Sequence, residues 1–174
     1  QIRSIENLVN EFSDFARMPK PIFKKINLYN IVSQSVKLHE MTYSKINFII
    51  TGKKEIILKG DEEQLNRVFI NLIKNSIESI NDKVSKNANF RGKISIEIKD
   101  DSDYIYVDCK DNGIGFGQID KKKMLTPYFT TKKNGSGLGL AVVTKIITDH
   151  NSLIEFNSSN EGAEVKIIIP KKYV

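Results

Sequence analysis

Three times along this chain, a segment with helical periodicity is followed by two strand-like segments, and this order constrains the fold more than any other feature. The strand-like segments lie at about 46–51, 55–58, 94–99, 103–110, 153–158 and 163–169. Single strands do not alternate with single helices, so a regular parallel βαβ arrangement does not fit. We therefore predict the α+β class, a two-layer α/β sandwich in which helices cover one face of a mixed sheet.

Two of the helical segments begin at residues that cap helix N-termini. Asn27 precedes a pattern whose apolar positions are Leu28, Ile31, Val32, Val36, Leu38 and Met41. Asp61 opens a long second pattern that reaches Ile80, and Gln64 has the spacing of a capping box.

The remaining segments are a short leading helix, a later helix and two loops. Helical spacing over residues 1–17 ends before Pro19, and a later helix is expected at about 137–149. Residues 84–92 and 116–136 are polar without periodicity, and loops as long as the second are typically lids or binding loops.

The bulk composition narrows the class of protein. The 174 residues are 40% apolar, enough for one domain with a real core. No apolar run approaches the roughly 20 residues of a membrane span, and Cys109, the single cysteine, excludes an internal disulfide framework. The net charge of +6 suits a polyanionic ligand, but only four of the basic residues are Arg and no aromatic-basic motif accompanies them. We expect no nucleic-acid binding.

Asp111 is the strongest candidate for ligand binding. It continues the phase of Ile105, Val107 and Cys109 on one strand face, and an inward carboxylate needs a partner. The exocyclic amine of adenine is a suitable donor, whereas the alternative is an ordinary Asp-Asn-Gly turn with an exposed carboxylate.

Two amides and a glycine cluster supply further candidates. Asn71 and Asn75 lie one turn apart on the long helix, where an amide oxygen suits Mg²⁺, although a solvated polar stripe would look the same. The segment Gly135–Leu140 runs from the long loop into a helix, and free N–H groups at such a start can surround phosphates. Phe129-Thr130-Thr131-Lys132 comes just before it, and its Lys could neutralise phosphate.

The two histidines are interpreted as structural. His39 lies among core positions of the helix that follows Asn27, and His150 lies near a helix C-terminus, where positive charge is favourable.

Taken in order, these segments resemble the sequence motifs, called boxes, of the catalytic ATP-binding domain of bacterial sensor histidine kinases. Asn71–Asn75 resembles the N box, Asp111–Gly115 the G1 box, Phe129–Lys132 the F box and Gly135–Leu140 the G2 box. Gly162-Ala163 resembles the last glycine box. The segment Glu11–Pro19 is similar to nitrogen-regulation sensor kinases.

The resemblance implies a Bergerat fold, with a mixed five-stranded sheet covered on one face by three helices and a short N-terminal helix. Residues 1–18 would be the end of the second helix of the dimerisation and histidine-phosphotransfer domain. Residues 19–174 would be the catalytic domain, with a lid at about 116–134.

By the same resemblance, ATP and Mg²⁺ are the cofactors, Asn75 is the metal ligand, and Asn71 and Lys132 are the catalytic residues. The nucleotide-binding set would be Asn75, Asp111, Gly113, Gly115, Phe129, Thr131, Gly137, Leu138, Gly139 and Leu140. Two residues depart from the family: Glu78 stands where a phosphate-binding Lys is common, which leaves Lys74 or Lys132 for that charge, and Ala163 stands where Thr is frequent.

The family also implies partners and a location. The chain would transfer the γ-phosphate to a histidine on a domain absent from it, and a response regulator receiver domain would take the phosphate next. The parent would be a homodimer, and this part of it would be cytoplasmic without membrane contact, which is compatible with an anchor in the bacterial inner membrane. The alternatives are an ATPase of the same superfamily, which has Glu at the position of Asn71, and a degenerate nucleotide-binding module without phosphotransfer.

Overall fold

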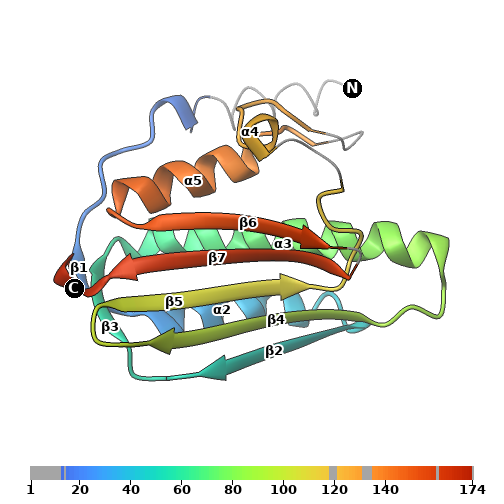
Figure 1. The fold of residues 1–174 in the computed structure, drawn as a ribbon, viewed down its shortest axis with the longest axis horizontal. Helices are drawn as coiled ribbons and strands as arrows, with labels where there is room; N and C mark the ends of the chain where they lie inside the picture. Colours follow the sequence, from blue (N-terminus) through green and yellow to red (C-terminus); the bar gives the residue numbers. More distant parts are fainter. Residues whose placement is uncertain (1–12, 14, 118–120, 131–134, 160, 174) are drawn as a thin grey trace.

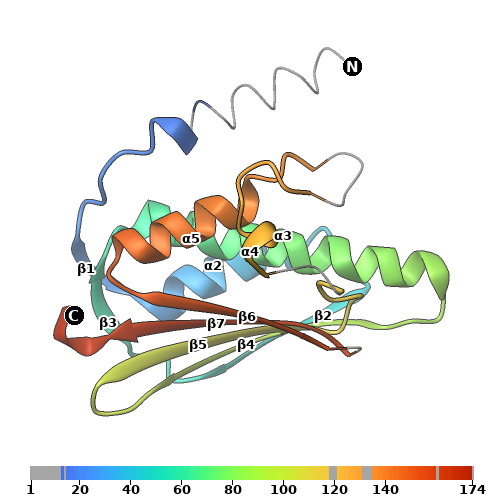
Figure 2. The same ribbon diagram turned by 45° about the horizontal axis from the view of Figure 1, so that its top comes forward.

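The computed structural model describes residues 13, 15–117, 121–130, 135–159 and 161–173, and it has two layers. The five strands of the main sheet are β2 (Ile46–Gly52), β4 (Gly92–Asp100), β5 (Tyr104–Asp111), β6 (Leu153–Ser159) and β7 (Gly162–Pro170). They lie in the order β2-β4-β5-β7-β6, with β2 parallel to β4 and the other pairs antiparallel. Helices α2 (Leu28–Glu40), α3 (Glu62–Lys86) and α5 (Gly139–Asp149) lie on one face of this sheet (Figures 1 and 2). The predicted α+β sandwich is confirmed.

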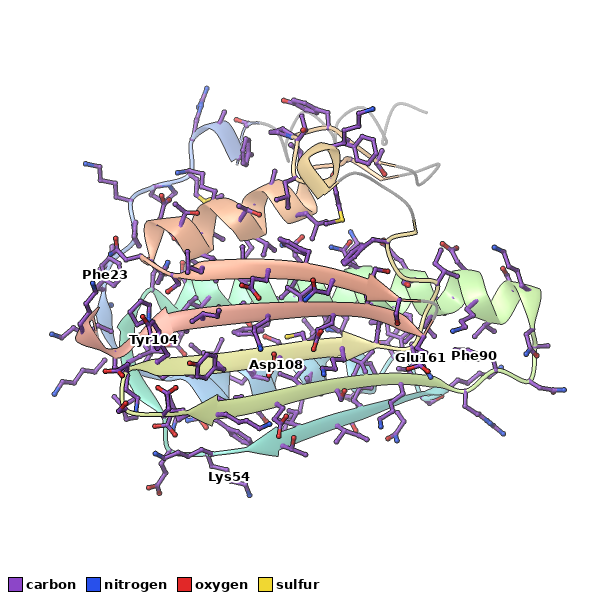
Figure 3. All side chains as sticks on the ribbon, viewed as in Figure 1. Phe23, Lys54, Phe90, Tyr104, Asp108 and Glu161 are labelled. Atoms are coloured by element: carbon purple, nitrogen blue, oxygen red, sulfur yellow. The ribbon has the colours of Figure 1, made fainter. Side chains whose placement is uncertain are left out.

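The alternation of residues along the strands decides which face of the sheet the helices cover. On β5, Ile105, Val107 and Cys109 are buried beneath the helices, whereas Asp108 projects from the other face (Figure 3). Burial raises the pKa of the Cys109 thiol to about 12, so this cysteine is a core residue rather than a reactive thiolate.

Both predicted helix caps form, but the predicted capping box does not. Asn27 Oδ1 accepts from Asn30 N at 3.2 Å, and Asp61 Oδ1 accepts from Gln64 N at 3.0 Å. The side chain of Gln64 donates instead to Pro19 O at 2.9 Å, and Asp61 N donates to His150 Nε2 at 3.0 Å. Partners distant in sequence have therefore replaced the local reciprocal bond.

Several boundaries differ from the sequence-based expectation. Leu38 and Met41 were predicted as core positions but are 61% and 91% exposed, because both lie to the side of the stripe that α2 buries. That stripe consists of Leu28, Ile31, Val32, Ser35 and Val36. The helix α3 continues to Lys86, so the predicted loop starts later than expected.

A second, two-stranded sheet lies beside the main one. Its strands are β1 (Lys24–Asn27), which was not predicted, and β3 (Ile57–Gly60), which lies two residues later than expected, and they pair antiparallel. This small sheet carries the chain from the N-terminal segment into α2 and from the main sheet into α3 (Figure 1).

The described part of the long connection after β5 contains one short helix, α4 (Lys121–Met124), and the chain ends in a 3-10 turn, η1 (Lys171–Tyr173). The leading helix predicted over residues 1–17 lies largely outside the described residues, although Arg17 N donates to Ser13 O as in a helix. Within the described ranges, no helix combines the length and the apolar character required to cross a membrane.

Candidate functional site

One side of α3 faces the start of α5, and Asn71 and Asn75 lie there. Asn71 Nδ2 donates to Arg67 O at 2.8 Å, one turn back, which fixes the orientation of its amide. A Cβ added at Gly139 would lie 3.1 Å from Asn71 Oδ1 and 3.9 Å from Asn75 Nδ2. Both amides therefore lie beside the first residue of α5, and the glycine there leaves space between the two helices.

The carboxylate of Asp111 lies at the end of β5 and is held on both oxygens. Oδ2 accepts from Ser76 Oγ of α3 at 3.0 Å. Oδ1 accepts from Gly113 N at 2.9 Å and from Ala163 N of β7 at 3.4 Å. Three separate segments therefore converge on one carboxylate.

Burial raises the pKa of the Asp111 carboxyl, although the hydrogen bonds from Gly113, Ser76 and Ala163 oppose that effect. A half-buried carboxylate at the end of a strand, with its charge only partly compensated, is ready to accept a further hydrogen bond from a ligand.

The turn after Asp111 packs tightly on α3. A Cβ at Gly113 would lie 2.2 Å from Ser79 Oγ and 2.8 Å from Ile80 N, so only glycine fits between the turn and the helix. The Lys83 amine donates to Asn112 O at 2.8 Å and to Gly113 O at 3.0 Å, which fixes the turn from the other side. Gly115 follows, and Phe116 N donates to Ser158 Oγ at 2.8 Å, which ties the loop to the end of β6.

The N-terminus of α5 suits an anion. Leu138 is its N-cap residue and no side chain among the described residues caps it, in contrast to the caps at the starts of α2 and α3. Val142 N is bonded to Leu138 O, and the N–H groups of Gly139 and Leu140 lie before that first helical bond. Unbonded N–H groups and the helix dipole together attract negative charge at this end.

The segment before α5 folds back on the chain near Phe129. Gly137 has φ +70°, and a Cβ there would lie 2.4 Å from the Tyr128 carbonyl carbon, so this close turn requires glycine. Tyr128 N donates to Gly137 O at 3.1 Å, which joins the Phe129 segment to the glycine-rich segment. Of the other predicted residues, Thr131 and Lys132 lie outside the described residues, and Lys74 is exposed on α3.

Together these groups fit a nucleotide with a divalent cation. Asp111 offers an acceptor to an amine on a base, the uncapped start of α5 offers N–H groups to phosphates, and the amides of Asn71 and Asn75 lie beside that start. No group of three His, Cys, Asp or Glu side chains in the described ranges could hold a metal. A cation here would be held by amide oxygen and by its own phosphate ligands.

Two contributors to the site did not emerge from the sequence. Ser76 bonds Asp111 and Lys83 bonds the turn, and both lie on α3, roughly four and six turns after Asp61. Their only signal was that they share a helix with Asn71 and Asn75.

The histidines have structural contacts. His39 Nδ1 lies 2.9 Å from Ser35 O on α2. His150 does not carry the positive charge that its position near a helix end suggested. Its Nε2 accepts from Asp61 N, and burial lowers its pKa, so the neutral ring is favoured.

Comparisons with known proteins agree with this arrangement. Residues 60–173 match the family model described as histidine kinase-, DNA gyrase B-, and HSP90-like ATPase. The chain is 33% identical over 162 residues to nitrogen regulation protein NtrY of Azorhizobium caulinodans, covering 93% of this chain and 21% of that protein. It is 35% identical over 178 residues to sporulation kinase A of Bacillus subtilis, covering 99% of this chain and 28% of that protein. It thus spans about a quarter of the curated relatives it matches.

Solved structures give the same result. The catalytic domain of histidine kinase ThkA, in a nucleotide-free form, has a TM-score of 0.74 and 28% identity, covering 86% of this chain and 96% of that one. A structure of ThkA in complex with the response regulator TrrA has a TM-score of 0.78 and 24% identity, covering 98% of this chain and 48% of that one. The chain therefore belongs to the histidine kinase-, DNA gyrase B- and HSP90-like ATPases, and within them to the catalytic domains of sensor histidine kinases.

Proposed function

We propose that this domain binds ATP with Mg²⁺ between α3, the turn after β5 and the start of α5, and transfers the γ-phosphate to a histidine on a separate domain. The observation that carries the proposal is the convergence of Asp111, Gly113 and Ala163 with Ser76 of α3. In this proposal the carboxylate accepts from the adenine amine, and Gly113 and Gly115 shape the adjoining wall.

The phosphates would lie at the start of α5, on the backbone of Gly137–Leu140. Asn75 would be the protein ligand of Mg²⁺, which when bound neutralises phosphate charge. Phe129 and Thr131 would belong to the nucleotide site through the lid at 116–134, with Lys132 or Lys74 as the phosphate-facing cation.

Transfer to an imidazole is favoured over hydrolysis because of Asn71. An amide cannot accept a proton from water at neutral pH, so this side chain can orient groups but cannot act as a general base. An incoming imidazole requires only that the phosphoryl group be held in line and its charge stabilised.

The partners follow from the proposed reaction. A histidine-bearing dimerisation domain would receive the phosphate, and residues 1–18 would be the end of one of its helices. A response regulator would take the phosphate next, and a similar kinase, ThkA, has been solved in complex with the response regulator TrrA. We further propose a homodimeric parent of which this part lies in the cytoplasm.

The test is ATP affinity measured by calorimetry in Asp111→Asn. Losing one charge-assisted hydrogen bond should weaken ATP binding by about 10- to 100-fold. Asp108→Asn is the matched control, because the same change on the opposite face of β5 should leave ATP affinity unaltered (Figure 3). Equal ATP affinity in the wild type and Asp111→Asn would show that Asp111 does not bind the adenine amine.

A degenerate module that binds nucleotide without transfer is the second candidate, favoured by Glu78 in place of a common Lys. It predicts normal ATP affinity but no labelled histidine when the parent's histidine domain is added.

A further inference from the structure

The segment between the helical turn that ends at Arg17 and β1 is held to the catalytic domain at two points. We define the linker as residues 19–23. Pro19 O accepts from Gln64 Nε2 at 2.9 Å, and Ile22 N donates to Asp61 Oδ2 at 2.8 Å. Both contacts are made by the first turn of α3, so one rigid element holds both ends of the linker.

His150 supports these contacts from the end of α5. Its Nε2 accepts from Asp61 N at 3.0 Å, and its Nδ1 lies 2.8 Å from Ile146 O. A carbonyl accepts and a backbone N–H donates, so the ring must be neutral with its proton on Nδ1. The Phe23 ring lies 5.1 Å from the His150 ring, centroid to centroid.

Among the described residues, few contacts other than these hold the linker. Ile22 is 68% exposed and Phe23 45% exposed, and an open hollow of about 410 Å³ lies between the linker and Lys145 and Asp149 of α5. The linker is nevertheless stiff, because Pro19 and Pro21 restrict their own backbone angles and those of the preceding residues. Holding a stiff segment at both ends fixes its direction.

The linker joins two functional parts. Upstream it meets the helical turn that ends at Arg17, and the side chains of Phe15 and Met18 pack against the core. Downstream, α3 begins at the linker contacts and carries Asn71 and Asn75 roughly three and four turns after Asp61. The helical turn that ends at Arg17 is thereby connected to the nucleotide site through α3.

We propose that Asp61, Gln64 and His150 are positioning residues that hold the linker, and with it the helical turn that ends at Arg17, in one orientation relative to the nucleotide site. The inference rests on the proposed function, because the orientation matters only if a histidine beyond the linker must reach the γ-phosphate.

Acid should loosen this arrangement. Protonation of Nε2 removes the acceptor for Asp61 N, and two N–H groups then face each other. The charged groups near the ring are the carboxylates of Asp61 and Asp149, and Asp149 is already paired with Lys145 at 2.9 Å. Burial lowers the pKa of His150 despite these carboxylates, which indicates that the folded arrangement favours the neutral ring.

The test uses Gln64→Leu, which removes the bond to Pro19 but keeps the helix cap, because the cap uses the backbone N–H of residue 64. Amide exchange of Ile22 in this chain, followed by NMR, should accelerate by about tenfold. In the parent kinase, kcat for histidine phosphorylation should fall by about the same factor while KM for ATP stays unchanged. Glu63→Leu, an exposed neighbour with the same replacement, should change neither quantity.

His150→Gln is the second variant, because a glutamine oxygen can accept from Asp61 N but does not titrate. Because the pKa of His150 is lowered from its ordinary value of 6.5, Ile22 in the wild type should exchange more slowly, relative to its intrinsic rate, as the pH rises through the acid range below about 6.5. This change should disappear in His150→Gln. Unchanged Ile22 exchange in Gln64→Leu overturns the proposal, as does a rise in KM with kcat unaltered. If the wild type binds no ATP, the proposed function fails, whereas the exchange result still decides whether these residues hold the linker.

Discussion

At the scale of single residues, Asp111 combines a cost in stability with a capacity for binding. Burial raises the pKa of this carboxyl, so the folded state binds its proton more readily than the unfolded state does. Its contribution to stability therefore decreases as pH rises from the unfolded pKa through the raised folded pKa, and the decrease persists at neutral pH.

Asp111→Asn should therefore be as stable as the wild type or more stable at pH 7 without nucleotide. The amide oxygen can still accept from Gly113 and Ala163, its nitrogen can donate to Ser76, and the buried charge is gone. We expect the free energy of unfolding in urea to rise by up to about 1 kcal/mol. A loss of that size would mean that the bonds to the carboxylate outweigh its burial.

Asn75→Ala tests the metal at the same scale. Alanine keeps α3 intact because it is the best helix former, while the amide oxygen is removed. The Mg²⁺ concentration that gives half-maximal ATP binding should rise by about tenfold, as expected for one lost ligand. Titration of Mg²⁺ at fixed ATP measures this, and an unchanged midpoint would show that Asn75 is a helix surface residue only.

The sequence predicted which residues face inward better than it predicted their partners. The inward direction of Asp111 follows from the alternation of Ile105, Val107 and Cys109, which is a local pattern. The bonds from Ser76 and Lys83 were not predictable, because they depend on the position of α3 over the end of β5. Leu38 is apolar yet exposed, because the buried stripe of α2 is centred on Leu28, Val32 and Ser35, and periodicity alone did not fix its width.

At the scale of elements, α3 organises the molecule. Its first turn contacts the linker, its middle faces α5 and its later turns hold the turn after β5. The start of α3 was predictable from Asp61, because this residue caps the helix through a hydrogen bond from Gln64 N, only three residues away. The strand β1 was not predicted, because four residues are too few to show alternation and its pairing with β3 is not local.

The connection from 116 to 134 should respond to nucleotide. In its described part only Lys121–Met124 is helical, and the side chains of Thr126, Pro127 and Tyr128 are exposed, as expected of a segment with low local stability. Hydrogen exchange followed by mass spectrometry should show slower exchange there with ATP and Mg²⁺, while peptides from β4 stay unchanged. If the exchange rates in this connection are the same with and without ATP, its role as a lid is contradicted.

At the scale of the whole molecule, both histidines of this chain lie away from the proposed phosphate site at the start of α5, His150 at the opposite end of that helix and His39 on α2. His150 is buried and both of its ring nitrogens are engaged. His39 lies on α2, and α3 lies between α2 and α5 (Figure 2). Neither histidine is therefore in a position to approach the start of α5.

This chain alone should accordingly acquire no stable phosphohistidine and should hydrolyse ATP only slowly. Asn71 cannot take a proton from water, and an acceptor imidazole must come from another domain. Adding the histidine-bearing domain of the parent should restore labelling, because transfer needs only an imidazole in line with a held phosphoryl group. Labelled ATP with mass spectrometry measures this, and His39→Gln serves as the control that should label as well as the wild type. Phosphate on His39 of the isolated chain would contradict both the role of the separate domain and the structural role of that histidine.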